Sequence, residues 1–342
     1  MDTPNLEWGK LPFGYIPTDY NTRCLYSNGA WGEVELSSSP FITLHIGATA
    51  LHYGQGTFEG MKAFLGVDGK VRVFRWQDNW ERICFSSEGV LMPAIPKDKF
   101  KKAVFETVKL NQRFIPPYGT GASLYIRPLI IGSGAKVGVS PADEYMLIVF
   151  VTPVGPYFPQ GFKGVDIQLV RDVDRAAPLG TGRFKVGGNY AASLSSLVRA
   201  GKEGFKTVLY LDAKEKKYID ECGPANFFGI KNNTYITPDS TSILRSITNL
   251  SLCTLAEDMG MKVERRRVPV EELSEFEEAG ACGTAAIITP IKSIQDRETG
   301  KVYTIGKGTD EPGPVCTKLY NRLQGIQYGT ESDRFGWTEV VE

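Results

Sequence analysis

Lys185 lies between glycines in the stretch GTGRFKVGGNYAASL, residues 180–194, and Tyr190 follows five residues later. A phosphate-binding P-loop needs the spacing GxxxxGK[ST], which Phe184 before the lysine and Val186 after it do not match. Two interpretations remain. The lysine is either a structural residue of a glycine-rich turn or an amine that forms a Schiff base with a carbonyl cofactor such as pyridoxal phosphate. The second requires a desolvated amine with room to move, which small neighbours supply.

A pyridoxal phosphate site makes further demands that other segments can meet. Glu221 in YIDECGPANFFGI could keep the ring nitrogen protonated. Ile247 and Thr248 in SITNLSLCTLAEDMG open a predicted helix, where backbone N–H groups can hold a phosphate. Thr284 in CGTAAIITP and Arg82 in NWERICF could add to the phosphate site. Taken singly, these are an ordinary turn carboxylate, a helix cap and a surface arginine, but together they satisfy one site.

The order of these motifs resembles one enzyme family. FKVGGNY, ECGPANFF, SITNLSL and CGTAAIITPI are similar to segments of branched-chain amino acid aminotransferases, which are fold-type IV enzymes dependent on pyridoxal phosphate. FGYIPTDY, LHYGQGTFEGMKAF, SLYIRPLIIG, VGVSP, VGPYFPQG and IQYG extend the resemblance over essentially the whole chain. It implies transamination of L-leucine, L-isoleucine and L-valine with 2-oxoglutarate, giving branched-chain 2-oxo acids and L-glutamate. It also implies a homodimer.

The resemblance assigns roles to individual residues. Lys185 would be the Schiff-base lysine and proton shuttle, Tyr190 would bind the phenolic oxygen of the cofactor, and Glu221 its pyridine nitrogen. The phosphate would be held by Arg82, Ile247, Thr248 and Thr284. The substrate pocket would be formed by Phe13, Tyr53, Phe58, Tyr125, Arg127, Tyr157, Thr284 and Ala285, with Val137 and Val139 reaching in from a partner subunit.

Substrate choice is expected to depend on the strand SLYIRP. Tyr125 and Arg127 are two residues apart and therefore share a face of that strand. By resemblance, Arg127 recognises the distal carboxylate of glutamate at the edge of the aromatic pocket, while Thr284 and Ala285 offer backbone donors to the α-carboxylate.

Three positions depart from the family. Ser246 stands where the family often has glycine, and serine can still cap the helix that follows. Pro224 has no N–H to donate. The redox-sensing CxxC of some mammalian members is absent at residues 285–288, so we expect no thiol switch.

Two alternatives stay open. One is another fold-type IV activity, a D-amino acid aminotransferase or a pyridoxal phosphate lyase, against which Arg127 and the aromatic pocket argue. The other is a small-molecule-binding protein without catalysis, which would not need the combination of Lys185, Glu221 and Tyr190.

We expect an α+β chain of two domains, because helices and strands mix without regular βαβ spacing. The domains are predicted at 1–152 and 165–342, joined by the Pro- and Gly-rich segment 153–164. Helices are predicted near 97–112, 190–200, 247–259, 270–278 and 314–324. Strands are predicted near 123–131, 145–152, 165–172, 206–211 and 226–237, with a strand-turn-strand at 281–291.

Composition excludes several other classes. The 39 basic and 39 acidic residues cancel, which gives no support for binding nucleic acid or a membrane surface. Six scattered cysteines and two histidines predict neither a zinc site nor any other metal. No apolar run approaches the roughly 20 residues that span a bilayer. Without a secretory signal pattern at the N-terminus, we expect a cytoplasmic protein with reduced thiols.

Overall fold

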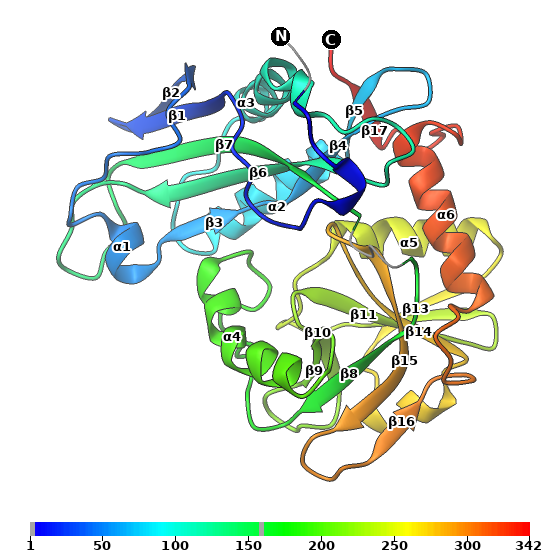
Figure 1. Ribbon diagram of the computed structural model, residues 1–342. Coiled ribbons are helices and arrows are strands. Elements are labelled where there is room, and N and C mark those ends of the chain that lie inside the picture. The colour runs from blue at the N-terminus through cyan, green and yellow to red at the C-terminus, as the bar shows by residue number, and fades with distance from the viewer. Residues whose placement is uncertain (1–3, 157–160) are drawn as a thin grey trace. The chain divides into compact units, whose positions relative to one another are not determined.

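The computed structural model describes residues 4–156 and 161–342, and the chain divides into two compact units, each built on its own sheet (Figure 1). The first unit takes Met1–Pro159, Phe184–Gly187 and Gly325–Glu342, and the second takes Gln160–Arg183 and Gly188–Gln324.

The first unit is an eight-stranded sheet within the described residues, with strand order β17-β5-β4-β6-β7-β1-β2 and β3 paired to β6. Its strands run from blue to green in Figure 1, apart from the red β17. The strands are β1 (Asn21–Ser27), β2 (Ala30–Ser37), β3 (Gly56–Phe58), β4 (Met61–Leu65), β5 (Val71–Phe74), β6 (Ser123–Gly132), β7 (Tyr145–Val154) and β17 (Thr338–Val340). The helices are α1 (Thr49–Tyr53), α2 (Trp76–Glu88) and α3 (Lys97–Leu110), with 3₁₀ turns η1 (Trp8–Lys10) and η2 (Gln112–Phe114).

Helix α3 forms because its apolar residues recur at helical spacing. Phe100, Val104 and Val108 are each 0% exposed and belong to the core of this unit. The predicted helix at 97–112 is confirmed, although it ends at Leu110 and a 3₁₀ turn follows.

The two long strands β6 and β7 pair antiparallel from Ser123↔Val154 to Gly132↔Tyr145. They confirm the strands predicted near 123–131 and 145–152. Their unbroken register gives Tyr125 and Arg127 a rigid support on one face.

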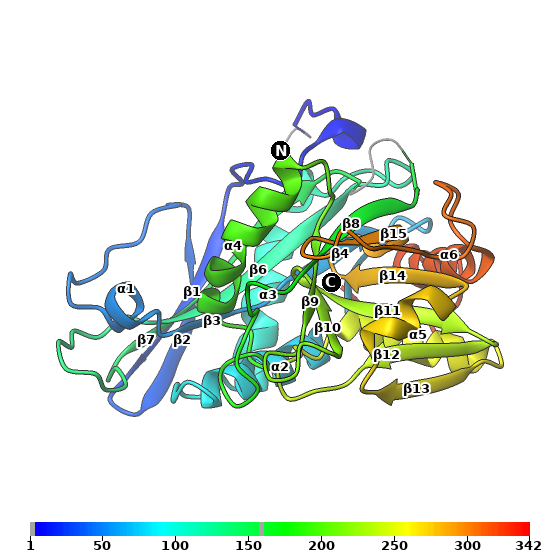
Figure 2. The same cartoon turned by 90° about the horizontal axis from the view of Figure 1, so that it is seen from below.

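The second unit is a nine-stranded mixed sheet among the described residues, with strand order β10-β9-β8-β15-β14-β11-β12-β13 and β16 paired to β15. The strands are β8 (Val165–Val170), β9 (Val208–Leu211), β10 (Ile219–Cys222), β11 (Ala225–Lys231), β12 (Thr234–Pro238), β13 (Lys262–Arg266), β14 (Glu278–Gly283), β15 (Ile287–Asp296) and β16 (Val302–Thr304). The helices are α4 (Gly187–Lys202), α5 (Ile247–Asp258) and α6 (Pro314–Tyr328), with a 3₁₀ helix η3 (Val270–Glu275). Helix α5 packs against β13 and β14. Figure 2 shows β14, β11, β12 and β13 side by side in this sheet, seen from below.

One predicted helix is wrong. Residues 270–278 form the 3₁₀ helix η3 and then the start of β14, where Glu278 pairs with Ile230. Val270, Leu273 and Phe276 are all buried. Their spacing of three matches the period of a 3₁₀ helix better than that of an α-helix, which explains the error.

The observed units also differ from the expected division at 153–164, which gave all of 165–342 to the second domain. The segment 184–187 joins the first unit because the Phe58 N–H donates to the Lys185 carbonyl. The C-terminal segment joins it because β17 pairs with β5, and Tyr328 donates to the Ala122 carbonyl.

Candidate active site

Lys185 is fixed through its backbone in the first unit. Its N–H donates to Ser86 Oγ of α2 at 2.9 Å, and its carbonyl accepts the Phe58 N–H of β3 at 3.1 Å. The next residue, Val186, forms an isolated β-bridge with Thr57. Helix α2 and strand β3, both far from Lys185 in the sequence, therefore fix the position of the lysine backbone.

The surroundings of the Lys185 amine favour its neutral form. Burial, and then the positive charge of Arg82, lower its pKa from 10.5 to about 8. With that pKa about one amine in ten is neutral at pH 7, against fewer than about one in a thousand at the usual value. The Nζ atom also lies 4.9 Å from the centre of the Phe58 ring. A larger neutral fraction of this kind is what the predicted Schiff-base lysine requires.

Arg82 is held by a buried carboxylate that the sequence reasoning did not single out. Glu59 is 0% exposed, and it accepts Arg82 Nε at 2.7 Å and Nη2 at 2.6 Å. This bidentate pair fixes the plane of the guanidinium. The only sequence signal was the position of Glu59 in FEGMK, directly after Phe58.

Four of the predicted substrate residues come together on this unit. Arg127 donates from Nη2 to the Tyr125 hydroxyl at 3.1 Å, and its guanidinium lies 4.9 Å from the Phe58 ring centre. The Phe13 and Tyr125 rings meet edge to face at 5.1 Å. Gly60 is required here, because a Cβ at that position would lie 2.1 Å from the Tyr125 hydroxyl. Aromatic rings around one arginine are the arrangement that the sequence predicts.

The Arg127 guanidinium keeps bonding capacity for a ligand. Its Nε is a buried donor with no hydrogen-bond partner among the described residues. A buried donor without a partner is costly, so a ligand oxygen that reached it would gain more than at the surface.

Lys62 is a second lysine on the same face, and the sequence reasoning missed it. It lies directly opposite Tyr125 in the β4–β6 pairing, so the two side chains share a face. Burial lowers its pKa to about 8 as well. The alternation of GMKAF could have signalled this, because it places Lys62 on one face and the buried Met61 and Ala63 on the other.

Tyr53, Val137 and Val139 lie elsewhere in the first unit. The Tyr53 hydroxyl donates to the Val137 carbonyl, while the Val137 and Val139 side chains are 90% and 88% exposed. The contacts described for Tyr53 are with Val137 and His52, not with Phe13, Phe58, Tyr125 or Arg127. Tyr157 lies outside the described residues.

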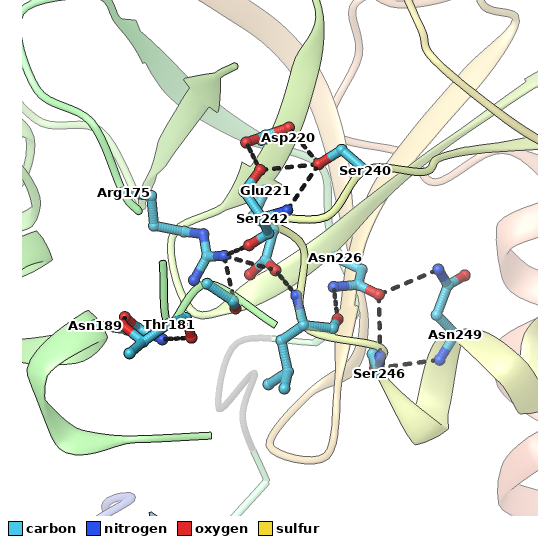
Figure 3. Close-up of polar contacts among 12 residues, drawn as sticks. Arg175, Thr181, Asn189, Asp220, Glu221, Asn226, Ser240, Ser242, Ser246 and Asn249 are labelled. Carbon is cyan, nitrogen blue, oxygen red and sulfur yellow. Dashed lines mark hydrogen bonds and ion pairs between the residues drawn. The ribbon is translucent and has the colours of Figure 1, made fainter. Parts of the chain in front are cut away.

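Glu221 is the centre of a polar network in the second unit (Figure 3). It lies on β10, is buried, and accepts the Leu244 N–H at Oε1. Arg175 Nη2 lies 3.4 Å from the same oxygen. A buried carboxylate with a cation and an N–H donor is suited to remain ionised. Arg175, in the loop after β8, was not anticipated.

The predicted phosphate-binding helix is held by asparagine side chains. Ser246 caps α5 by accepting the Asn249 N–H at Oγ, at 3.2 Å, which confirms that serine can replace glycine as a cap here. Asn226 accepts the Ser246 N–H at 3.2 Å and donates to the Leu244 carbonyl at 2.9 Å. The N–H groups of Ile247 and Thr248 are in the first turn, where a helix offers donors to anions.

The turn that carries Thr284 and Ala285 connects β14 to β15 and is strained. Ile287 has φ 64°, and the Ile288 N–H donates to the Ala286 carbonyl at 2.9 Å. This is a γ-turn with positive φ at a β-branched residue, a rare conformation that surrounding structure must enforce. Strain of this kind concentrates at ligand-binding positions.

Tyr190 lies in the first turns of α4. Its neighbour Asn189 anchors that end of the helix, since Asn189 Nδ2 donates to the Thr181 carbonyl at 2.8 Å and Oδ1 accepts the Thr181 hydroxyl at 2.8 Å (Figure 3).

Other chemistry finds less support. In residues 4–156 and 161–342, no group of three or more His, Cys, Asp or Glu side chains could hold a metal ion. All six cysteines are buried and unbridged. None of the described helices has the length and apolar character needed to cross a bilayer. On β13, Arg266 pairs with Glu264 and with Glu272.

Comparisons with known proteins agree with this geometry. The family described as "Amino-transferase class IV" matches residues 56–294. The chain belongs to the class IV aminotransferases. A branched-chain-amino-acid aminotransferase of Haemophilus influenzae is 46% identical, with 99% of each chain covered.

Solved structures give the same answer for the fold of this class IV aminotransferase. The branched-chain amino acid aminotransferase of Escherichia coli superposes with a TM-score of 0.79 at 28% identity, over 95% of this chain and 100% of that one. The enzyme of Thermobaculum terrenum, solved in its PLP-form, gives a TM-score of 0.79 at 24% identity, over 95% of this chain and 99% of that one. The predicted family and the α+β, fold-type IV class are confirmed.

Proposed function

We propose that this enzyme transfers the amino group of L-leucine, L-isoleucine and L-valine to 2-oxoglutarate, giving branched-chain 2-oxo acids and L-glutamate. The observation that carries the proposal is the 46% identity, over 99% of both chains, to an enzyme named for this activity. The arrangement around Lys185 and Arg127 supports it independently, because it combines a low-pKa amine with an arginine that lies against two aromatic rings.

The cofactor is pyridoxal 5'-phosphate, and the residues present fit it. Lys185 offers an amine whose pKa is already lowered for attack on an aldehyde. Glu221 offers a buried carboxylate suited to a ring nitrogen, and the capped start of α5 offers N–H donors suited to a phosphate. When bound, the cofactor supplies an electron sink and carries the amino group between the two substrates.

Individual residues of the chain would bind the cofactor and transfer the substrate proton. Lys185 Nζ would hold the cofactor and move the proton of the substrate Cα. Tyr190 would donate to the phenolic oxygen, and Glu221 would pair with the ring nitrogen. Arg82, Ile247, Thr248 and Thr284 would hold the phosphate.

Substrate selection belongs to the face of β6. Phe13, Phe58 and Tyr125 surround an aliphatic side chain, and Arg127 Nε, buried without a hydrogen-bond partner among the described residues, is available to the distal carboxylate of 2-oxoglutarate. Thr284 and Ala285 bind the α-carboxylate through the strained turn before Ile287. The family resemblance also assigns Tyr53 and Tyr157 to substrate binding.

A steady-state assay across amino-acid donors tests the function. With 2-oxoglutarate as acceptor, we expect turnover of L-leucine, L-isoleucine and L-valine and none of D-alanine. Turnover of D-alanine in preference to L-leucine would favour the D-amino acid aminotransferase. Purified protein without cofactor absorbance or a borohydride-reducible imine would favour a non-catalytic binding protein. Lys185→Ala should abolish turnover, while the exposed Lys202→Ala should not affect it.

A homodimer is part of the proposal. The segments around α1 and residues 135–140 are joined by the Lys136 N–H bond to the Gly47 carbonyl, at 2.8 Å. Together they expose a group of large apolar side chains, here called the apolar loop surface: Phe41, Ile46, Leu51, Val137 and Val139, between 61% and 90% exposed. Apolar side chains grouped in this way mark protein interfaces, and a second copy of the chain is the proposed occupant. From there Val137 and Val139 would reach the substrate of the partner subunit.

We also propose a cytoplasmic location. Six buried, unbridged thiols suit a reducing compartment. A thiol titration of the denatured protein, purified without reductant, should return six free thiols, and fewer would argue against this location.

A further inference from the structure

We propose that Arg175 is a positioning residue that keeps Glu221 ionised, so that the proton shared with the cofactor's ring nitrogen stays on the nitrogen. The inference rests on the proposed function, since it concerns the carboxylate assigned to that nitrogen.

The guanidinium of Arg175 is buried beside one carboxylate oxygen of Glu221. Arg175 is 7% exposed and Glu221 is 2% exposed, and Nη2 of the arginine lies 3.4 Å from Glu221 Oε1. The same Nη2 donates to the Gly182 carbonyl at 3.0 Å and to the Ser242 carbonyl (Figure 3). The two carbonyls thus fix the orientation of the Arg175 guanidinium, and its positive charge lies beside the Glu221 carboxylate.

A glycine of the lysine motif makes this approach possible. A Cβ on Gly182 would lie 2.4 Å from the Ser242 carbonyl oxygen and 2.8 Å from Ser242 Cα. Only a residue without a side chain lets the two carbonyls converge on Arg175. This gives Gly182 a role other than providing room for Lys185.

One segment, residues 240–244, forms hydrogen bonds with both Arg175 and Glu221. Ser242 contributes its carbonyl to Arg175, and Leu244 contributes its N–H to Glu221. The segment is tied on its other side to Asp220, which accepts Ser242 Oγ at 2.5 Å and Ser240 Oγ at 3.1 Å. Burial raises the pKa of Asp220, while both serines and Arg175 act in the opposite direction.

The position of the proton follows from the charges. In a buried hydrogen bond between a pyridine nitrogen and a carboxylate, the proton lies on the more basic partner. Burial alone favours the neutral acid, which would break the N–H bond and form an O–H bond on Glu221. A cation 3.4 Å away stabilises the carboxylate and reverses that preference. No electron is transferred. Only the proton changes place, and with it the strength of the electron sink.

The experiment uses holoenzyme loaded with pyridoxal phosphate labelled with ¹⁵N in the ring. Nitrogen NMR distinguishes a protonated ring nitrogen from a neutral one without reference to turnover. We expect a protonated signal in the wild type and a neutral one in Glu221→Gln. Arg175→Met should also shift the signal to the neutral position, and Arg175→Lys, which keeps the charge, should restore the protonated one.

Ser242→Ala is the matched control for a general loosening of the packing around Arg175 and Glu221. It removes the Oγ bond to Asp220 but keeps the backbone carbonyl and the charge of Arg175, so we expect its ring nitrogen to stay protonated. The same neutral signal in Ser242→Ala as in Arg175→Met would show that loss of packing, not loss of charge, moves the proton.

The remaining outcomes separate this inference from the proposed function. A protonated signal in Arg175→Met beside a neutral one in Glu221→Gln would overturn the inference alone. A wild-type signal that is neutral, or that does not respond to Glu221→Gln, would overturn the proposed role of Glu221. Should Arg175→Met fail to fold, Arg175→Gln removes the same charge, and a protonated signal there overturns the inference equally.

Discussion

At the scale of single residues, burial changes the chemistry of ordinary side chains. Burial and Arg82 lower the pKa of Lys185, which suits its proposed role as a nucleophile, and Arg127 Nε is buried without a hydrogen-bond partner among the described residues, which suits its proposed role as a selective donor. The sequence predicted both residues, since each lies in a specific motif. It did not predict Glu59, Lys62 or Arg175, because their importance comes from neighbours that only the folded chain supplies.

The pKa of Lys185 predicts how the apoprotein responds to pH. Its pKa is lowered from 10.5 to about 8 on folding, so between these values the unfolded chain binds more protons than the folded one. The stability of the folded apoprotein therefore rises as the pH rises through this window. At pH 7, Lys185→Met should stabilise the apoprotein by about 1 to 3 kcal/mol, with the gain lost towards pH 10.5. Urea denaturation at pH 7 and 10 measures this, and a gain independent of pH would contradict it.

Arg127 predicts a selective loss of one substrate. Arg127→Met should lower kcat/KM for 2-oxoglutarate by about 10- to 100-fold, the worth of a hydrogen bond to a charged group. The value for L-leucine should change far less, because the aliphatic side chain needs no donor. Single-turnover measurements of each half-reaction separate the two effects. Arg113→Met, which breaks a surface pair with Asp19, serves as control. Equal losses for both substrates would refute the role.

At the scale of elements, the start of α5 and the turn between β14 and β15 carry several of the proposed binding groups. Helix α5 was predictable because its cap and its apolar run are local signals. The strained γ-turn at Ile287 and the short strand β10 were not, because both are imposed by pairing with distant strands. Local spacing also explains why an α-helix was wrongly predicted at 270–278, because apolar residues three apart fit both an α-helix and a 3₁₀ helix.

The cap of α5 predicts a graded effect on stability. Ser246→Ala removes the bond from the Asn249 N–H and should cost about 1 kcal/mol, whereas Ser246→Gly should cost only a few tenths. Affinity for pyridoxal phosphate should fall in the same order if this helix start binds the phosphate. Chemical denaturation of the apoprotein and a cofactor titration measure the two quantities. A larger loss of affinity in Ser246→Gly than in Ser246→Ala would contradict the assignment.

At the scale of the whole molecule, the chain forms two units that are not continuous in sequence. The Pro- and Gly-rich segment predicted a division near 153–164, but composition could not reveal that 184–187 and 325–342 return to the first unit. Residues 325–342 join the first unit because β17 pairs with β5, and residues 184–187 join it because Val186 forms a bridge with Thr57. The lysine segment thus belongs to the unit that carries Tyr125 and Arg127.

The apolar loop surface predicts the oligomeric state. Wild-type protein should sediment as a dimer, and the double variant Ile46→Asp, Val139→Asp should sediment as a monomer, because two charges would be buried at the interface. Val302→Asp changes an exposed apolar residue of β16 in the second unit and should leave the dimer intact. A double variant that sediments like the wild type would place the interface elsewhere.

The central claim is that one amine, that of Lys185, carries the cofactor. Holoenzyme reduced with borohydride, digested and mapped by mass spectrometry tests it most directly, because Lys62 offers a second, partly buried amine whose pKa is also lowered to about 8, on the same unit. We predict a single phosphopyridoxyl adduct, on Lys185. An adduct on Lys62, on any other lysine, or on none would contradict the account.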